Sequence, residues 1–176
     1  MSLPILHSIV GVSIVVLCYP RNSLTKDWKL LLFAALIAVS PDLDYLLVYG
    51  LHMSYEYHRS FTHSVFVAPA IALLILIANR FSHVKLTLVY TLVLLSHGIL
   101  DFLVSYEKDG VKLLYPLSDK RFEFEMIEMF ERTTNSWQEF INQASLELII
   151  FTPILLILLL VREFLLTESA LESENY

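Results

Sequence analysis

Long hydrophobic segments alternate with polar connections along the chain. Five of these segments are nearly free of Lys and Arg and approach or exceed the length needed to cross a hydrocarbon core about 30 Å thick. They cover residues 3–19, 30–49, 62–78, 84–104 and 144–161. The pattern therefore predicts an all-α fold, a polytopic membrane helical bundle of about five transmembrane helices.

The first hydrophobic segment also resembles a signal peptide in length. No Lys or Arg precedes it, and the residues from Leu17 to Pro20 lack the small side chains of a cleavage site. We therefore interpret it as the first helix of the bundle. One transmembrane domain is expected over residues 1–165, followed by a frayed acidic tail over residues 166–176.

The longest polar connection, residues 105–142, contains a second kind of pattern. Residues 122–140 mix Phe, Met and Ile with Glu, which is typical of an amphipathic helix at the membrane interface or over a site. A plain connecting helix is the alternative interpretation of this segment.

Composition supports a membrane protein and argues against nucleic acid as a ligand. Hydrophobic residues make up 56% of the 176 residues and charged residues 17%, below the roughly 25% of soluble domains. The formal net charge is −6, whereas nucleic-acid binding favours a basic surface. Cys18 is the single cysteine, which excludes an intrachain disulfide and a cysteine-based zinc ribbon.

Basic residues are unevenly distributed between the two sides of a five-helix topology. The short connections on one side, with the end of the last helix, contain Arg21, Lys26, Lys29, Arg80, Lys85 and Arg162. The other side has Arg59 in a short loop and the longer connection of residues 105–142. Because basic short loops stay in the cytoplasm, we expect an inner-membrane protein with an extracytoplasmic N-terminus and a cytoplasmic C-terminus.

Six ionisable residues lie within or at the edges of the hydrophobic segments. An ionised acid at the bilayer centre costs roughly 2.5–3.5 kcal/mol on insertion scales, and few basic residues are available there to pair with these acids. A bound cation with His as a further ligand would neutralise them. The residues are His7, Asp42, Asp44, His97, Asp101 and Glu147.

The depth of these residues predicts that they converge. In the topology above they all lie toward the extracytoplasmic ends of their helices, and His58 and His63 flank the start of the third helix at the same level. His97 and Asp101 are four residues apart and share a helix face. We therefore predict a metal site near the outer-leaflet level, with metal ligands His7, Asp42, Asp44, His58, His63, His97, Asp101 and Glu147.

Local sequence around Pro41 and Ser60 suggests how the ligands are presented. Pro41 disturbs the second helix, and Ser40 is expected to cap a restarted helix, so that Asp42 and Asp44 approach one site. Ser60 or Thr62 is expected to cap the third helix. Taken singly, each residue also has an ordinary explanation as a helix cap, a packing pair or an interfacial charge; the metal site is favoured by their combination.

The motifs His-Arg-Ser-Phe-Thr-His-Ser (58–64), Ser-Pro-Asp-Leu-Asp (40–44) and Ser-His-Gly-Ile-Leu-Asp (96–101), with His7, resemble a known family. It is the family of LexA-binding, inner-membrane-associated metal-dependent hydrolases. The resemblance extends to Leu-Tyr-Pro-Leu-Ser-Asp-Lys-Arg-Phe (114–122) and is weaker in the last span; Ser60 stands where the family often has Gly. The spacing of His97 and Asp101 also resembles zinc phospholipase C and P1-type nucleases, but four residues alone are a weak match.

Three classes of function are compatible with this site. The first is a hydrolase in which metal-activated water cleaves a phosphoester of a lipid or lipid-linked substrate, with Asp42, Asp44 and Arg59 catalytic and Arg59, Lys120 and Arg121 binding the substrate. Zinc is the first choice of metal, and Mn or Fe are alternatives. The second class is a membrane metal transporter or sensor, and the third is a non-catalytic regulatory membrane protein. Membrane lipids are the expected partners in the first class.

Overall fold

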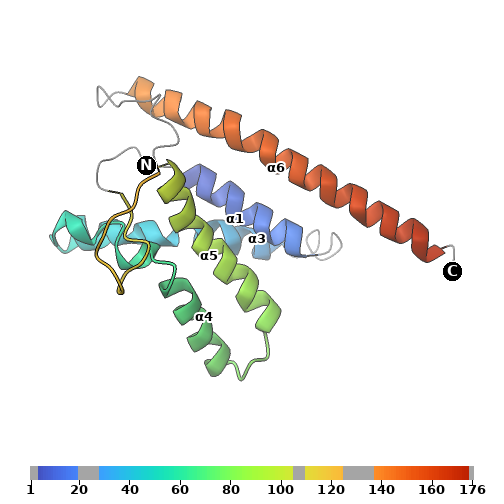
Figure 1. Cartoon of the computed structure of the whole chain (residues 1–176), viewed down its shortest axis with the longest axis horizontal. Coiled ribbons are helices and arrows are strands. Elements are labelled where there is room, and N and C mark those ends of the chain that lie inside the picture. The colour runs from blue at the N-terminus through green and yellow to red at the C-terminus, as the bar shows by residue number, and fades with distance from the viewer. Residues whose placement is uncertain (1–3, 20–27, 105–109, 125–136, 175–176) are drawn as a thin grey trace. The chain divides into compact units, whose positions relative to one another are not determined.

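The computed structural model describes residues 4–19, 28–104, 110–124 and 137–174 (Figure 1). The chain forms two compact units, Met1–Thr133 and Thr134–Tyr176, and each is described by itself. The regular elements of the described residues are helices, accompanied by one isolated β-bridge between Val111 and Phe122. The predicted all-α membrane fold is confirmed, and the single domain over residues 1–165 stays a prediction.

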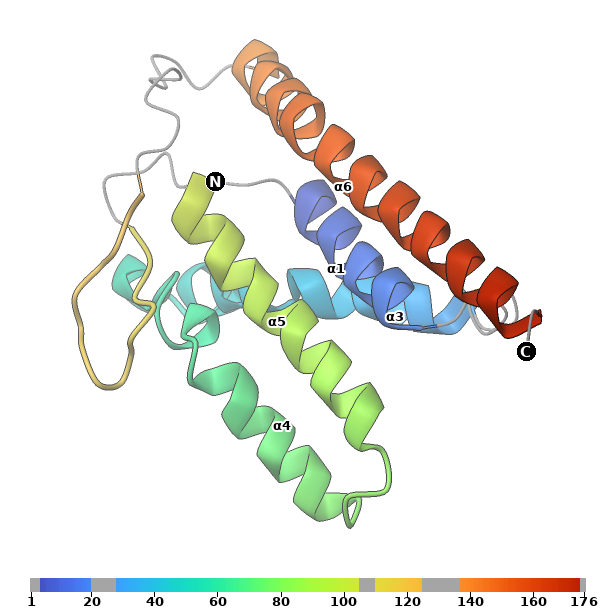
Figure 2. The ribbon, with the colours of Figure 1, turned by 45° about the vertical axis from the view of Figure 1, so that its right-hand side comes forward.

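Four α-helices of the first unit pack against one another. Contacts join α1 to α3 and α5, α3 to α5, and α4 to α5, so that α5 touches the other three (Figure 2). Their bounds are α1 Pro4–Cys18, α3 Trp28–Val39, α4 Val67–Ala78 and α5 Val84–Val104. Each sequence is apolar around most of its circumference, as expected for helices surrounded by protein and lipid.

Small residues let α1, α3 and α5 approach closely. A Cβ atom on Gly11 would lie 2.6 Å from Ala38 Cβ and 3.1 Å from the Ala34 carbonyl oxygen. The buried core at this crossing consists of small and β-branched side chains, which suits close helix packing in a membrane. Its members are Val15, Ala34, Ala38, Val89 and Val93.

The second helix breaks at Pro41, as predicted, but the break has a different form. α3 gives way to a 3₁₀ helix, η1 (Ser40–Asp44), and then to a π-helical turn, η2 (Leu46–Gly50). Ser40 does not cap a restarted helix, since its hydroxyl donates to the Ile37 carbonyl oxygen at 2.8 Å. This bond satisfies a carbonyl left without its usual partner where proline interrupts the helix.

The third helix begins later than its hydrophobic segment. Two short 3₁₀ helices, η3 (Tyr55–Tyr57) and η4 (Phe61–His63), precede α4, and the chain bends by 53° between Tyr55–His63 and Val67–Ala78. The expected caps are wrong, because the Ser60 hydroxyl donates to the Tyr57 carbonyl oxygen and that of Thr62 to Asp44. Helix α4 starts without a side-chain cap.

Residues 110–124 form a loop that is hydrogen-bonded to the segment between Arg59 and Val65. The Lys112 amide donates to the Arg59 carbonyl oxygen at 3.0 Å, and the Val65 amide donates to that of Leu113, also at 3.0 Å. The Ser64 hydroxyl donates to the Tyr115 carbonyl oxygen. The expected amphipathic helix at residues 122–140 falls largely on residues 125–136, outside the described residues, and residues 122–124 are not helical.

The second unit contains one long helix, α6 (Trp137–Glu174), with Pro153 inside it. The expected frayed tail is wrong in part, because residues 166–174 continue this helix. Glu147 belongs to α6, and its side chain lies outside the described part of the structure. Its role as a metal ligand therefore stays a prediction.

Two helices of the described residues are long and apolar enough to cross a membrane, at Val84–Leu103 and Ala144–Phe164. The bent pair of Tyr55–His63 and Val67–Ala78 adds a third if it is one broken span. The remaining expected spans form shorter helices, since the 15 residues of α1 rise about 22 Å and the 12 of α3 about 18 Å. Both are below the hydrocarbon thickness of about 30 Å.

Candidate metal centre

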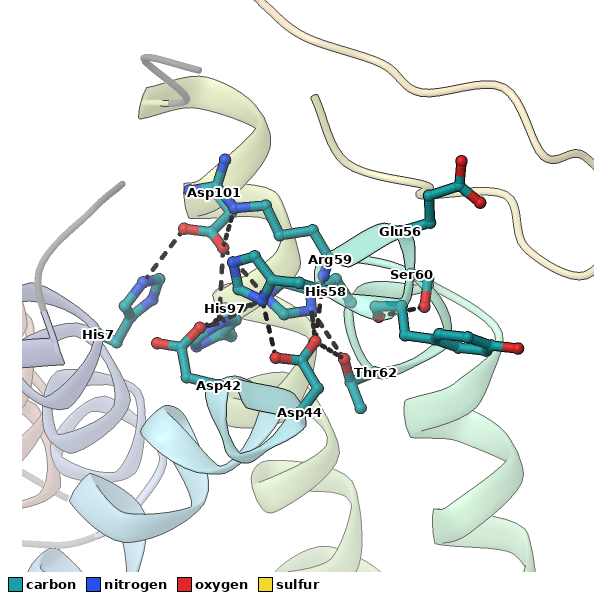
Figure 3. Close-up of polar contacts among 12 residues, drawn as sticks. His7, Asp42, Asp44, Glu56, His58, Arg59, Ser60, Thr62, His97 and Asp101 are labelled. Atoms are coloured by element: carbon teal, nitrogen blue, oxygen red, sulfur yellow. Dashed lines mark hydrogen bonds and ion pairs between the residues drawn. The ribbon is translucent and has the colours of Figure 1, made fainter. Parts of the chain in front are cut away.

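Four side chains from three parts of the first unit meet at one point. Asp42 follows α3, His63 precedes α4, and His97 and Asp101 occupy the last two turns of α5. One potential ligand atom from each lies within 4.8 Å of every other. Figure 3 shows His97, Asp42 and Asp101 directed toward a common centre, with the neighbouring polar residues around them. The four residues are called the metal cluster below.

The distances within the metal cluster fit one shared cation. Tetrahedral ligands with bonds of about 2.0–2.1 Å lie about 3.3 Å from each other. His63 Nε2 lies 3.0 Å from His97 Nε2 and 3.1 Å from Asp101 Oδ2. His97 Nε2 lies 3.4 Å from Asp42 Oδ1 and 3.7 Å from Asp101 Oδ2, and His63 Nε2 is 3.7 Å from Asp42 Oδ1. These five distances bracket the tetrahedral value.

Both imidazoles of the cluster are oriented by hydrogen bonds at Nδ1. The His97 Nδ1–H donates to the Ala38 carbonyl oxygen at 2.6 Å. The Thr62 hydroxyl gives its proton to Asp44 Oδ2 at 2.8 Å, so its oxygen accepts from His63 Nδ1–H at 2.9 Å. In neutral rings, both Nε2 atoms then present lone pairs toward each other. A cation between them would turn this repulsion into coordination, and Nδ1 bonds of this kind orient histidine ligands in metal sites.

Asp44 lies beside the metal cluster and organises the segment that carries His58. Its Oδ1 accepts a hydrogen bond from His58 Nδ1 at 2.8 Å, and its Oδ2 accepts from the Arg59 amide at 3.1 Å and from Thr62. Both oxygens are thus occupied by hydrogen-bond donors. The structure brings Asp44 and His58 next to the cluster but places neither among its four members, so their assignment as ligands stays a prediction.

Arg59 places a buried guanidinium against the cluster. The residue is 1% exposed, and its Nε lies 3.7 Å from Asp101 Oδ2. Its backbone has a φ of 55°, a left-handed conformation that non-glycine residues seldom adopt. Hydrogen bonds of its amide to Asp44 and of its carbonyl to the Lys112 amide hold this conformation. The backbone conformation at Arg59 therefore places a permanently charged guanidinium beside the histidines and aspartates of the site.

The charges of the site favour a dication. Asp42, Asp44 and Asp101 contribute three negative charges, and Arg59 contributes one positive charge. With neutral histidines this leaves a charge of −2 in a largely buried region, which is costly to maintain without a counter-ion. Two imidazoles and two carboxylates are a ligand set used by zinc and also compatible with Mn or Fe.

His7 reaches the cluster from α1. Its ring stacks on that of His97 with centroids 3.8 Å apart, and its Nε2 lies 3.4 Å from Asp101 Oδ1. This is the carboxylate oxygen other than the one that faces His63 and His97. His7 is thus in position to orient Asp101 or to add a ligand, and it lies close to the centre as the sequence predicts.

Lys120 and Arg121, the expected substrate-binding residues, have different surroundings. Lys120 is exposed, with its Nζ 5.6 Å from the centroid of the Phe122 ring. Arg121 donates to the carbonyl oxygens of Gly110 at 3.2 Å and Glu56 at 3.0 Å, and more weakly to His58 at 3.4 Å. Arg121 therefore joins the 110–124 loop to the His58 segment.

One residue that helps to build the site was not singled out from the sequence. Gly98 lies where α5 crosses η4, and a Cβ atom at this position would be 2.4 Å from the His63 carbonyl oxygen. The absence of a side chain lets the backbone of His63 approach α5, which brings its imidazole to His97. The sequence signal was a glycine directly after a candidate ligand inside an apolar helix.

Comparisons with known proteins agree on a membrane protein. A sequence model of a family described as YdjM inner membrane protein matches residues 1–170. "Inner membrane protein YbcI" of Escherichia coli (strain K12) is 39% identical over 99 residues, which are 52% of this chain and 57% of that protein. The match thus spans a little over half of the relative's length. No solved structure matches the chain. Neither description names an activity.

Proposed function

The chain belongs to the YdjM inner membrane protein family, and we propose that it is a metal-dependent hydrolase of that membrane. The observation that most supports this is the metal cluster, whose donor atoms lie 3.0–3.7 Å apart in the five measured pairs. Zinc is the proposed metal, with Mn or Fe as alternatives. The proposed substrate is a phosphoester of a membrane lipid or lipid-linked compound.

When bound, a dication at this site supplies Lewis-acid activation of water and of the scissile group. The chain's own residues provide the other functions. His58 is held through Nδ1 by Asp44, and its buried Nε2 makes no hydrogen bond within the described residues. His58 Nε2 is therefore the proposed proton acceptor, with Asp44 as its positioning residue, a pairing known from catalytic dyads and triads.

Arg59 is the residue proposed to bind the phosphate group of the substrate. Its guanidinium is beside Asp101, and a planar, permanently charged fork suits phosphate oxygens. Charge that develops on those oxygens would be stabilised in a region from which water is largely excluded. Asp42 is the most accessible member of the metal cluster. Its side chain is 13% exposed, whereas the side chains of the other three members are 0–3% exposed.

The experiment compares metal content and hydrolysis in the same preparations. Wild-type protein in mild detergent is loaded with zinc and assayed on phospholipids, lipid phosphates and acyl substrates, beside Asp42→Asn and His97→Ala. Asp119→Asn is the matched control, since this exposed aspartate pairs only with Lys112 among the described residues. We expect stoichiometric zinc and phosphoester cleavage in wild type and control, and loss of both in the two cluster variants.

Two results would contradict the proposal. Wild-type protein that takes up zinc but releases no phosphate or phosphorylated headgroup from any substrate would exclude phosphoester hydrolysis. Activity that persists in metal-free Asp42→Asn and His97→Ala proteins would separate the reaction from the cluster. Arg59→Lys distinguishes bond types, because it should impair phosphoester cleavage and leave ester or amide cleavage nearly unchanged.

The burial of the cluster favours a second candidate, a non-catalytic metal site in a sensor or regulatory protein. Four protein ligands would complete a tetrahedral site, as in structural zinc sites, whereas catalytic zinc keeps an open position. This candidate predicts tight zinc binding, a large increase in thermal stability on loading, and no turnover of any substrate. Transport is less favoured, because the four candidate ligands lie together at one end of the described helices.

We also propose that the site faces the extracytoplasmic side, on the distribution of basic residues in short loops. Cysteine introduced at Ser54 or Ser118 in a Cys18→Ser background should react with an impermeant thiol reagent in intact cells. The control at Ser23 should react only after lysis. The opposite labelling pattern would place the site and the N-terminus in the cytoplasm.

A further inference from the structure

A large apolar cavity lies between α3, α4 and α5, apart from the metal cluster. Its volume is about 580 Å³, and no member of the cluster lines it. This size falls within the roughly 300–1,000 Å³ of ligand pockets. The cavity's walls include Phe33, Ile71, Ala72 and Ile75, and none of the residues that line it is acidic. It is called the α3–α4–α5 groove below.

The groove has one polar end. Lys29 in the first turn of α3, Asn79 at the end of α4 and His83 just before α5 all line it. Asn79 and His83 lie on either side of the turn of the α4–α5 hairpin (Figure 2), and Lys29 lines the same groove from α3. Arg80 follows Asn79 in the α4–α5 connection, so this end of the groove is basic.

The length of the groove corresponds to one leaflet of a bilayer. From Lys29 to Ile37 the rise along α3 is about 12 Å, and from Ala68 to Asn79 it is about 16 Å along α4. Half of a hydrocarbon core of about 30 Å is about 15 Å. An acyl chain of one leaflet would therefore fill the groove from its polar end to its inner end at Ile37 and Leu94.

We infer that the α3–α4–α5 groove binds one acyl chain of an anionic phospholipid whose phosphate lies at Lys29 and His83. The apolar walls match the chain, and the basic end matches the phosphate. Thr87 and Thr91 offer hydroxyl groups along one wall of the groove, below the headgroup level. Basic residues next to a membrane surface attract anionic lipids, and a fitted groove adds selectivity for one molecule.

This lipid is a ligand distinct from the proposed substrate. The inner end of the groove at Leu94 is still about one helical turn from His97, and the basic end is at the opposite end of α5 from Asp101. The headgroup is thus held far from the metal cluster. The inference does not depend on hydrolysis, and it would stand if the cluster proved to be a structural metal site.

Lipid retention by the full-length protein tests the inference. The protein is reconstituted in nanodiscs of phosphatidylglycerol and phosphatidylethanolamine in equal amounts, transferred to mild detergent and analysed by native mass spectrometry. Wild type should retain one phosphatidylglycerol. Lys29→Gln with His83→Gln should lower the preference for the anionic lipid about fivefold or more, whereas Lys85→Gln, which removes a charge outside the groove, should leave it unchanged.

A second pair of variants tests the apolar part. Ile75→Trp fills the groove and should abolish retention of either lipid, whereas Ile77→Trp, on an exposed position of the same helix that does not line the groove, should not. The inference is wrong if wild type retains no lipid, if the Lys29/His83 variant matches Lys85→Gln, or if Ile75→Trp still retains lipid. It is also wrong if cysteines placed at Ile75 and at Leu156 of α6, in a Cys18→Ser background, form a disulfide in nearly all molecules, because α6 then occupies the groove.

Discussion

Gly98→Ala tests the construction of the metal cluster without removing a ligand. A Cβ atom at position 98 would lie 2.4 Å from the His63 carbonyl oxygen and 3.2 Å from the carbonyl carbon. Both contacts are with backbone, so no side-chain rotation can relieve them. α5 and the η4 segment must separate, and this would move His63, which makes the contact, away from His97, the neighbour of Gly98.

The size of the effect follows from these distances. Ordinary contact at about 3.4 Å requires a separation larger by about 1 Å than the structure allows. Metal sites tolerate deviations of about 0.2 Å in ligand distances, so His63 and His97 could no longer share one ion in their present positions. We expect zinc affinity to fall about 100-fold or more, the upper end of effects from orienting residues. Overpacking should also cost about 1–3 kcal/mol of stability in metal-free protein.

Zinc affinity is measured by competition with a chelating dye, and stability by thermal unfolding with and without zinc. Gly50→Ala is the matched control, because a Cβ atom there has nothing within 4 Å. It should bind zinc as wild type does. If Gly98→Ala is folded and keeps wild-type affinity and zinc-dependent stabilisation, His63 and His97 do not bind one ion in the arrangement described.

Two other substitutions probe the surroundings of the cluster. Thr62→Val removes the hydroxyl that joins His63 Nδ1 to Asp44, and it should lower zinc affinity about 10–100-fold in the same titration. The control Thr91→Val loses only a hydrogen bond to its own helix and should keep wild-type zinc affinity. Equal zinc affinities of the two variants would contradict the orienting role of Thr62. Arg121→Gln breaks the bonds to the His58 segment and should cost about 2 kcal/mol, or roughly 4–8 °C in melting temperature, compared with little change for Lys120→Gln. A melting temperature equal to that of Lys120→Gln would show that the loop is held by other contacts.

The members of the metal cluster were largely predictable because they are ionisable residues within or beside apolar segments. An aspartate or histidine in an apolar helix needs a partner, and Asp42, His97 and Asp101 lie at comparable depth in the predicted topology. His63 was predicted at the same level from its place beside the third helix. The structure brings these four side chains together, which is what the argument from depth predicted.

The local backbone was less predictable, because distant segments determine it. Residues 62–66 belong to the predicted third helix, yet the Val65 amide donates to the Leu113 carbonyl oxygen and the Arg59 carbonyl oxygen accepts from the Lys112 amide. Partners about 50 residues away leave no periodic signal in either segment. The same reason explains Asp44, which the sequence suggests as a ligand and the structure shows in hydrogen bonds to the His58 segment.

The turn after Pro41 is the feature that reconciles a four-residue cluster with catalysis. A catalytic metal needs a position that water can occupy, and three of the four candidate ligands are held in place: two imidazoles by their Nδ1 bonds and Asp101 by its position in α5. Asp42 lies in a 3₁₀ turn and is the most exposed member. Because proline removes a backbone hydrogen bond there, movement of this turn disturbs less helix than movement of His97 or Asp101 in α5. The reaction we propose therefore requires Asp42 to be the ligand that yields its position.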